Sequence, residues 1–400
     1  MTCVQRALVL AALVRATGAA VACSPTVSGL DGDRAFLRCY ACASSTLLLG
    51  LNSTDAATLC APDATDSPAP LVARALYNIG EMQGHWWLDD SGDIEENATA
   101  CLQHLLDYMP KRDTLVFFND IFFALDFLSE TVRLSLLQWP RLRDAGVSFD
   151  IFLDAILPYA VLNEKRDFSW RWRPRFGRLF ESAWEGAGTN VSMAMHALSD
   201  MIPTGAAGYL PALVDSGAVE PQASNVITWR SSVSPGFLSP EQVATAFGSC
   251  TGTGILMVAA ARSIGIPARL AGCSQTDVPN DDHHWLEFYD PSSPGPFGTY
   301  WHTKEGTSKG NEGGPWDSPS GPMSGCLKGV LPSSQLNTMW ASAWSSPEYL
   351  PTLWAMDGPL TGENYARVGG LNVCGAYCSA WGCGPNQTSF WNQSACSPAM

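Results

Sequence analysis

The residues of this chain that could do chemistry together are a cysteine at the start of a helical pattern and a histidine pair at the start of a strand pattern. Cys250 directly precedes a long apolar segment with helical spacing, and glycines flank it on both sides. His283 and His284 open the alternating segment 283–289. A helix N-terminus and a nearby imidazolium both stabilise a thiolate, the nucleophilic form of cysteine. The combination therefore predicts acyl transfer through a thioester.

Two features of this combination leave alternatives open. A cysteine in an oxidising compartment is most often buried or disulfide-bonded, and the position of Cys250 alone would fit that structural role. The strand period of two places His283 and His284 on opposite faces, so only one of them can face the helix that Cys250 begins. The period alone does not choose between the two histidines.

The flanking sequence predicts the elements that would hold these residues. Ser239–Gln242 combines a Ser cap, a Pro in the first turn and a Gln at the position that completes a capping box. A second helix should run from Cys250 to the helix-ending sequence Gly265–Pro267. Residues 268–273 and 283–289 are predicted strands. Residues 291–326 are rich in Gly, Pro and Ser and are predicted to form a long loop.

Three motifs in this region occur in a specific order. They are Gly248–Cys250, Arg262–Arg269 and His283–Glu287. A Cys-led helix, then R-x-x-G-I-P-A-R, then H-x-W-h-E on a strand resembles the transglutaminase-like branch of the papain-like thiol enzymes. The resemblance is strong over about residues 230–340 and fainter back to about 155, and it does not cover residues 23–95 or the C-terminal tail.

The resemblance implies a role for each motif residue. Cys250 matches the family's nucleophile, and His283 matches its base by the H-x-W spacing, with His284 as the neighbour. The implied activity is acyl transfer on amide groups of a protein or peptide substrate, by cross-linking, deamidation or hydrolysis. The alternative is a non-catalytic secreted binding or wall-associated module that retains the transglutaminase-like fold.

The third catalytic group and the oxyanion donor are less well determined. The family usually has an Asp four residues after a Trp on the next strand, and Glu305 stands at that place here. Asp290 is the other candidate for this role. The backbone N–H of Cys250 is a candidate oxyanion donor, and Trp229 and Gln242 are candidates among the side chains.

Composition and charge exclude several classes of function. Of the 400 residues only 15% are charged, and the formal net charge of −15 disfavours nucleic acid and anionic membrane surfaces as partners. No apolar run after the N-terminus is long enough to span a bilayer. The chain lacks a Gly-x-Ser-x-Gly elbow, a Walker loop and a His-Glu-x-x-His motif, so nothing supports a serine hydrolase, an NTPase or a zincin. No cofactor and no metal is expected.

The N-terminus and the sequons predict secretion. Residues 1–22 have the basic start, apolar run and small-residue cleavage site of a signal peptide. Asn-x-Ser/Thr sequons, which predict a glycoprotein, occur at Asn52, Asn97, Asn190, Asn386 and Asn392. The 13 cysteines gather towards the two ends, and in an oxidising compartment such groups predict disulfides rather than a metal site.

The whole pattern predicts an α+β protein in which a helical N-terminal half precedes a papain-like, transglutaminase-like core. In that core the Cys-bearing helix packs on a small antiparallel sheet, and disulfides staple the terminal segments. The predicted parts are a signal peptide (1–22), a loop-rich Cys-containing segment (23–95), a helical region (96–220), the core (221–345) and a Cys-rich tail (346–400). Between 162 and 173 a dense run of basic and aromatic residues predicts a network of ion pairs and stacked arginines.

Overall fold

The structure is a computed structural model of the chain. It describes residues 77, 94–110, 113, 121–162, 164, 166, 171–202, 208–209, 226–229, 239–245, 247–275, 281–295, 299–304, 339–346 and 370–372. The chain divides into two compact units, Met1–Arg133 and Leu134–Met400. Helix α7 (Ile121–Leu136) crosses the boundary between them. The candidate site lies in the second unit.

The first unit contains helix α5 (Ile94–Tyr108) and most of α7. The buried residues of α5 include Ala98, Cys101, Leu102 and Leu105, which recur at helical spacing and form one apolar stripe. Cys101 carries a free thiol, and its complete burial raises the pKa of that thiol far above its ordinary value. The thiol of Cys101 is therefore inert.

The second unit begins with short helices, two of which are capped by side chains. They are α8 (Trp139–Asp144), α9 (Phe149–Ala155), α10 (Trp172–Phe180), the 3₁₀ helix η2 (Glu181–Trp184) and α11 (Val191–Met201). Ser148 accepts a hydrogen bond from the Ile151 N–H to start α9, and Asn190 accepts one from the Met193 N–H to start α11.

A five-stranded antiparallel sheet forms the centre of the second unit. Its strand order is β6–β5–β4–β7–β8, and all neighbours are antiparallel. The strands are β4 (Ala268–Gln275), β5 (Asp281–Tyr289), β6 (Trp301–Lys304), β7 (Met339–Ser342) and β8 (Gly370–Asn372). A smaller sheet pairs β1 (Gly208–Tyr209) with β2 (Val226–Trp229) and β2 with β3 (Phe247–Gly248).

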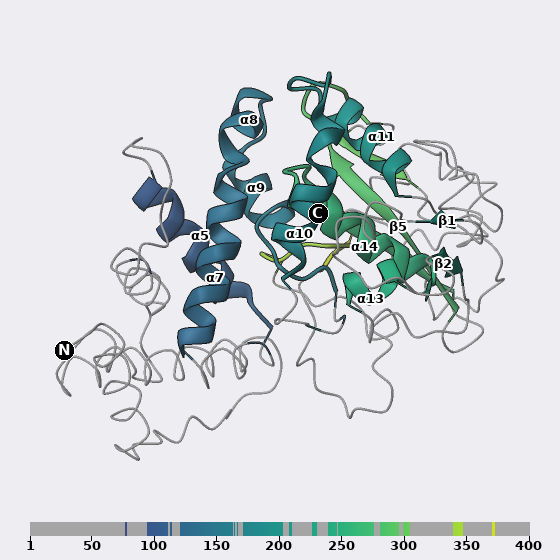
Figure 1. The fold of residues 1–400 in the computed structure, drawn as a ribbon, viewed down its shortest axis with the longest axis horizontal. Helices are drawn as coiled ribbons and strands as arrows, with labels where there is room; N and C mark the ends of the chain where they lie inside the picture. Colours follow the sequence, from purple (N-terminus) through teal and green to yellow (C-terminus); the bar gives the residue numbers. More distant parts are fainter. Residues whose placement is uncertain are drawn as a thin grey trace, which may run out of the picture. The chain divides into compact units, whose positions relative to one another are not determined.

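Helix α14 (Cys250–Ser263) packs on one face of the large sheet. Every residue of α14 after Cys250 is buried, and Figure 1 shows the helix running alongside β5, with α10 and α13 (Pro240–Thr245) beside it. A Cβ atom at Gly254 would lie too close to Leu270 Cδ1 of β4, so the glycine allows Leu270 to pack directly on the helix backbone. Leu270 lies opposite Leu286 in the register of β4 and β5, which identifies the face of β5 that meets α14.

The structure confirms the predicted α+β core with a helix on a small antiparallel sheet. The predicted capping box is present, because Ser239 Oγ accepts from the Gln242 N–H at 3.3 Å and Gln242 Oε1 accepts from the Ser239 N–H at 3.1 Å. Helix α14 ends as expected, and Gly265 has a φ of 79° just beyond it. The predicted signal peptide, nearly all of residues 23–95, the disulfides of the terminal segments and most of the tail lie outside the described residues.

One strand corrects the predicted loop. Residues 301–304 fall inside the segment 291–326 that composition assigned to a loop, but they form β6 and pair with β5 from Leu286 to Tyr289. Tertiary pairing overrides the local composition here. Phe288 and His302 stack across this pair with ring centroids 5.0 Å apart, which adds an aromatic contact to the backbone hydrogen bonds.

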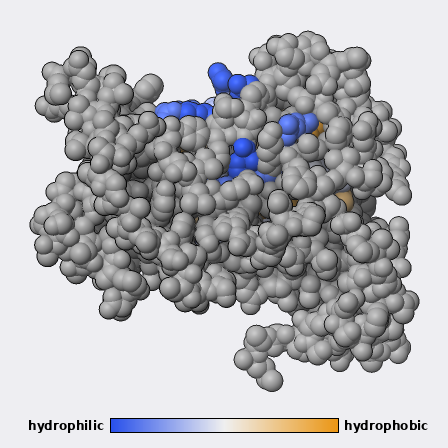
Figure 2. All heavy atoms as spheres, turned by 90° about the horizontal axis from the view of Figure 1, so that it is seen from below, coloured by the Kyte–Doolittle hydropathy of each residue, from blue (hydrophilic) through white to orange (hydrophobic). Residues whose placement is uncertain are grey.

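None of the helices in the described part of the chain is long and apolar enough to cross a membrane. The described side chains that reach the face shown in Figure 2 are mainly hydrophilic.

Candidate active site

Cys250 is the first residue of α14, and the residues before it hold the start of the helix in place. Ser249 is the N-cap, and its hydroxyl accepts a hydrogen bond from the Gly252 N–H at 3.4 Å. A Cβ atom at Gly248 would lie 2.9 Å from Val243 Cγ1 and 3.2 Å from the backbone nitrogen of Thr253. The Gly-Ser-Cys motif is therefore a packed helix start, in which glycine gives the clearance and serine the cap.

The thiol of Cys250 is free and half-buried. Within the described residues its one hydrogen-bond partner is the hydroxyl of Thr251, with Sγ and Oγ1 3.9 Å apart. The disulfide alternative for Cys250 is thus not what the structure shows. A partly exposed free thiol at the first residue of a buried helix can meet a substrate without unfolding of that helix.

The histidine that faces α14 is His284. Its Nδ1 lies 2.7 Å from Thr251 Oγ1, and the residue is completely buried. His284 shares its face of β5 with Leu286, which lies opposite the leucine that touches α14. The start of α14 and the strand that bears both histidines are therefore joined through one hydroxyl group.

His283 belongs to the other face by strand alternation, because it neighbours His284 in a regular strand. Its backbone pairs with Cys273 of β4, and its side chain lies outside the described side chains. The assignment of His283 as the base from the H-x-W spacing stays a prediction. The sequence predicted that the two histidines lie on opposite faces of the strand. The contact between Gly254 of α14 and Leu270 of β4 shows which of these faces meets the helix.

On the far face of the sheet, two other motif residues bind each other. Arg269 Nε donates to Glu287 Oε2 at 2.6 Å, and both side chains are nearly buried. The guanidinium carbon of Arg269 also lies 3.8 Å from the ring centroid of Trp301 on β6. These residues join three strands, β4, β5 and β6. Sequence analysis gave them no role, although the two motif positions are direct partners in the strand register.

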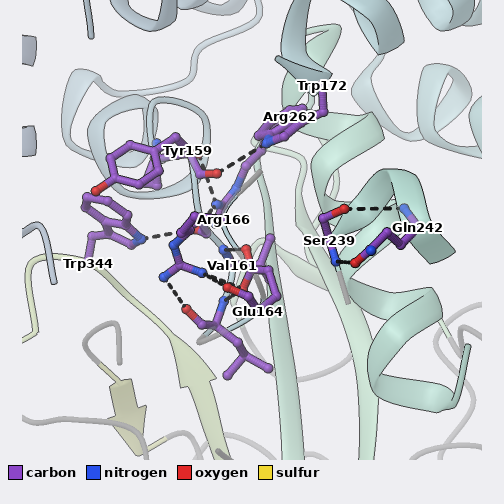
Figure 3. Close-up of polar contacts among 12 residues, drawn as sticks. Tyr159, Val161, Glu164, Arg166, Trp172, Ser239, Gln242, Arg262 and Trp344 are labelled. Atoms are coloured by element: carbon purple, nitrogen blue, oxygen red, sulfur yellow. Dashed lines mark hydrogen bonds and ion pairs between the residues drawn. The ribbon is translucent and has the colours of Figure 1, made fainter. Parts of the chain in front are cut away.

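The other motif arginine, Arg262, binds the backbone of an upstream loop. Its Nε donates to the Ala268 carbonyl, and its Nη1 donates to the carbonyls of Pro158 and Ala160 at 3.3 and 2.8 Å. Burial lowers the pKa of Arg262 to about 10, although Glu164 and Asp154 oppose the shift. Figure 3 shows Arg262 directed into this loop, with the indole of Trp344 donating to the Ala160 carbonyl from another side.

Arg173 of α10 binds the same loop. Its guanidinium donates to the carbonyls of Ile156, Leu157 and Pro158 and to that of Arg262 at the end of α14. Burial, together with the positive charge of Arg262, lowers the pKa of Arg173 to about 9. Carbonyls at a helix C-terminus attract cations, so Arg173 also stabilises the end of α14.

The basic and aromatic run behaves as predicted where it is described. Glu164 accepts from the N–H groups of Val161 and Leu162 at 2.8 and 2.7 Å, and its carboxylate pairs with Arg166 at 3.2 Å (Figure 3). Arg173 lies 4.8 Å from the ring centroid of Trp172. The described part of the run is thus a structural network, in which Glu164, Arg166 and Arg173 are engaged with one another's neighbours and with backbone groups rather than held open for an acidic ligand.

Asp290 has a structural role that separates it from the histidines. Its two carboxylate oxygens accept hydrogen bonds from the N–H and hydroxyl groups of Ser192 and of Ser292. Burial raises the pKa of Asp290, but these hydrogen bonds outweigh burial and hold the pKa below its ordinary value. Asp290 lies six residues along the chain from His284, which is about 20 Å in an extended strand. It therefore cannot orient either histidine.

The remaining predicted site residues are only partly covered. Glu305 follows β6 directly and lies outside the described residues, as does the side chain of Trp229. The side chain of Gln242 takes part in the capping box of α13, so it is not available as an oxyanion donor. Among the described candidates, the backbone N–H of Cys250 remains. Among the described residues no group of three or more His, Cys, Asp or Glu side chains could hold a metal ion.

Residues 218–302 match the family model described as the transglutaminase-like superfamily. The match contains β2, α13, β3, α14, β4 and β5, and so includes Cys250 and both histidines. No curated protein and no solved structure matches the chain significantly. The resemblance to the transglutaminase-like superfamily is thereby confirmed over residues 218–302.

Proposed function

We propose that this chain is a secreted cysteine-dependent enzyme that acts on amide bonds of a protein or peptide through a thioester at Cys250. The observation that carries the proposal is the free, half-buried thiol at the first residue of α14, joined through Thr251 to a histidine of β5 inside the matched segment. A thiol and an imidazole in this relation are the minimum for covalent acyl transfer.

The reaction runs in two halves. The Cys250 thiolate attacks the amide carbonyl carbon, and the C–N bond breaks as the histidinium gives its proton to the departing ammonia or amine. Water or a second amine then attacks the thioester carbon, returns one proton to the histidine and releases the Cys250 sulfur. Water gives deamidation or hydrolysis, and an amine gives cross-linking.

The base is one of two neighbouring histidines, and two arguments bear on the choice. The H-x-W spacing of the resemblance favours His283, with Glu305 as the group that orients it. The contact between Thr251 and His284 favours His284, which lies on the face that meets α14. We keep His283 as the proposed base, because His284 is completely buried and bonded to the hydroxyl of Thr251, itself 1% exposed, and so cannot reach the departing amine. Single replacements of His283 and His284 by alanine, compared at neutral pH, decide between the two assignments.

Secretion and glycosylation rest on the sequence patterns and on one structural observation. Asn190 is exposed, and it caps α11 through Oδ1, the amide oxygen. An N-linked glycan attaches to the amide nitrogen, so the cap and a glycan are compatible at this residue. Asn97 is half-buried on α5, and the other sequons lie outside the described residues.

Alkylation at mildly acidic pH tests the proposal, because only an activated thiolate reacts there. The purified secreted protein is treated with iodoacetamide, and intact mass and peptide mapping locate the label. We expect one label at Cys250, none at the buried Cys101, and no label in Cys250→Ser. Incubation with a glutamine-containing peptide library, with and without a labelled amine, then separates transfer from hydrolysis.

Two results would count against an enzyme. Mapping Cys250 to a disulfide in the secreted protein would remove the nucleophile. A Cys250 that alkylates no faster than an ordinary exposed thiol, with no turnover of any peptide, would favour the binding-module alternative, to which the replacement of the family's Asp by Glu305 also points.

A further inference from the structure

We propose that Thr251 and His284 form a positioning pair, whose hydrogen bond holds the first turn of α14 at a fixed place on β5. This inference rests on the proposed function and deepens it, since it assigns roles to two residues that take no part in the chemistry. Thr251 adjoins the nucleophile Cys250 in the chain, and His284 adjoins the proposed base His283. The hydrogen bond of the pair therefore governs the distance between the two reacting groups.

The pair supplies the directional contact between α14 and β5. Thr251 Oγ1 and His284 Nδ1 lie 2.7 Å apart, and within the part of the chain that the structure describes no other side chain of α14 forms a hydrogen bond with β5. The described neighbours of His284 on this face of β5, Leu286 and Phe288, are apolar. Apolar contact has no preferred direction, whereas a hydrogen bond weakens steeply with distance and angle. The hydrogen bond therefore fixes where along the strand the helix begins.

Burial makes this contact permanent and keeps it apart from the substrate. His284 is completely buried and Thr251 is 1% exposed, so water does not compete for either group. A buried polar group that loses its partner is costly, and the hydrogen bond therefore stays formed while the protein is folded. The same burial prevents the imidazole of His284 from reaching a departing amine. Its role is to hold the nucleophile in place, and the proton transfers belong to His283.

Other contacts cannot take over this role at the first turn. Arg173 and the indole of Trp184 donate to carbonyls at the C-terminal end of α14, about 20 Å away along a helix of 14 residues. Ser249 caps the N-terminus, but it is bonded to the helix itself and would move with it. Both partners of the positioning pair adjoin the motif residues in sequence, so the link acts where the reacting groups are.

The position of the thiol matters for both its activation and its reaction. An imidazolium stabilises a thiolate by an attraction that falls with distance. A misplacement of about 1 Å can slow a reaction by about 100-fold. A purely structural role of the pair predicts only a loss of stability, with an unchanged pH dependence of thiol reactivity in the folded protein. A positioning role predicts that this pH dependence changes as well.

The test uses the full chain and replaces each partner in two ways. Thr251→Val removes the hydroxyl at nearly constant volume, and Thr251→Ser keeps it. His284→Leu removes the hydrogen-bonding nitrogen, whereas the amide introduced by His284→Asn can take the place of Nδ1 but cannot act as a base. Thr253→Val is the matched control, because Thr253 is equally buried on α14 and its hydroxyl has no hydrogen-bond partner within the described residues. Thermal unfolding gives the temperature below which each variant is fully folded.

The rate of iodoacetamide alkylation of Cys250 is followed as a function of pH at a temperature where every variant is folded. We expect Thr251→Val and His284→Leu to slow alkylation at neutral pH by about 10- to 100-fold and to move the pH–rate profile to higher pH. Thr251→Ser and His284→Asn should stay within about threefold of the natural protein. Thr253→Val should leave the rate and the profile unchanged.

The positioning pair acts through His283, so a double variant separates its effect on reactivity from its effect on stability. Thr251→Val should slow alkylation no further in a chain that already carries His283→Ala, because the group that the pair positions is then absent. Urea unfolding of the same double variant should still show the loss of stability from Thr251→Val, because the hydrogen bond to His284 is broken in either background.

The outcomes separate the pair from the function on which it rests. If the natural protein alkylates fast and Thr251→Val matches it in rate and profile, the positioning role is wrong while the thiol enzyme stands. A full additional slowing in the His283→Ala background would also overturn it, as would a folded His284→Asn variant that is as slow as His284→Leu. If Cys250 of the natural protein reacts like an ordinary thiol, the function itself fails, and the pair loses its role with it.

Discussion

The buried ion pair between Arg269 and Glu287 predicts that replacing either partner destabilises the protein, but by different amounts. Their side chains lie directly opposite on β4 and β5, and their exposed fractions are 11% and 1%. Replacing Arg269 by Met leaves an ionised carboxyl in the interior without its cation. Replacing Glu287 by Met leaves a guanidinium that still lies 3.8 Å from the Trp301 ring and reaches solvent at its edge. The two single changes should therefore differ in cost.

The magnitude follows from burial. Removing one partner of a buried ion pair costs about 3–5 kcal/mol of unfolding free energy, because the other charge is left uncompensated. We expect Arg269→Met to lie at the upper end of that range. Glu287→Met should cost about 2 kcal/mol less, since contact with an aromatic face retains about 1–2 kcal/mol and partial exposure retains the rest. The double variant should cost less than the sum of the two, because it buries no lone charge.

Equilibrium urea unfolding measures these costs. Tryptophan fluorescence follows the transition, to which Trp285 and Trp301 on β5 and β6 contribute among the 15 tryptophans of the chain. Arg143→Met is the control, because Arg143 and Asp144 are 3.7 Å apart but about two-thirds exposed, and their contact should be worth no more than about 1 kcal/mol. Equal costs for the two single variants, or full additivity in the double variant, would refute the reasoning.

Three further predictions concern the packing and the caps around the site. Gly254→Ala should destabilise the protein by about 1–3 kcal/mol through the collision with Leu270, and Leu270→Ala in the same chain should relieve part of that strain; thermal unfolding of the single and double variants measures both. Asp290 has a pKa below its ordinary value, so its stabilising effect is present above the unfolded-state pKa of about 4 and is lost as pH falls through the folded-state pKa. Ser292→Ala should therefore destabilise the protein at neutral pH, and its difference from the natural protein should shrink on acidification below about pH 4; a constant difference would contradict this. Asn190→Gln should remove one glycan mass from the secreted protein and cost about 1 kcal/mol through the lost cap of α11, and an unchanged mass would show that this sequon is unused.

The parts of the site that could be predicted from the sequence depend on local signals. The capping box of Ser239 and Gln242, the helix start at Cys250 and the turn at Gly265 each involve residues within one turn of one another. Such patterns act through backbone hydrogen bonds and φ preference, which need no partner from elsewhere in the chain. Strands β4 and β5 were found for a similar reason, because alternation and the flanking breakers are local as well.

The parts that could not be predicted depend on which surfaces meet. Strand alternation separated His283 from His284, but which face of β5 meets α14 depends on the packing of the helix on the sheet, seen in the contact of Gly254 with Leu270 of β4. Strand β6 was hidden in a Gly- and Pro-rich segment because its stability comes from pairing with β5 and from Trp301 against Arg269. Neither effect leaves a pattern in a short window of sequence.

The residues that hold the Cys250 helix, α14, in place extend beyond the segment that matches the family model. The match begins at residue 218, yet the buried guanidinium of Arg262 finds its acceptors at Pro158 and Ala160. The carbonyls at the end of α14 find donors upstream as well: Arg173 donates to Arg262, and the indole of Trp184 donates to Ile264 at 2.7 Å.

Each of these groups is buried, so losing its partner would leave a polar atom unsatisfied at a cost of about 1–3 kcal/mol. The sum over several such groups is comparable to the whole stability of a small domain. The position of the Cys250 helix is therefore fixed at its N-terminus by residues of the matched segment and at its C-terminus by residues that precede it. The loop at 156–162 therefore helps to position helix α14, and with it Cys250, although it lies outside the segment that matches the family model.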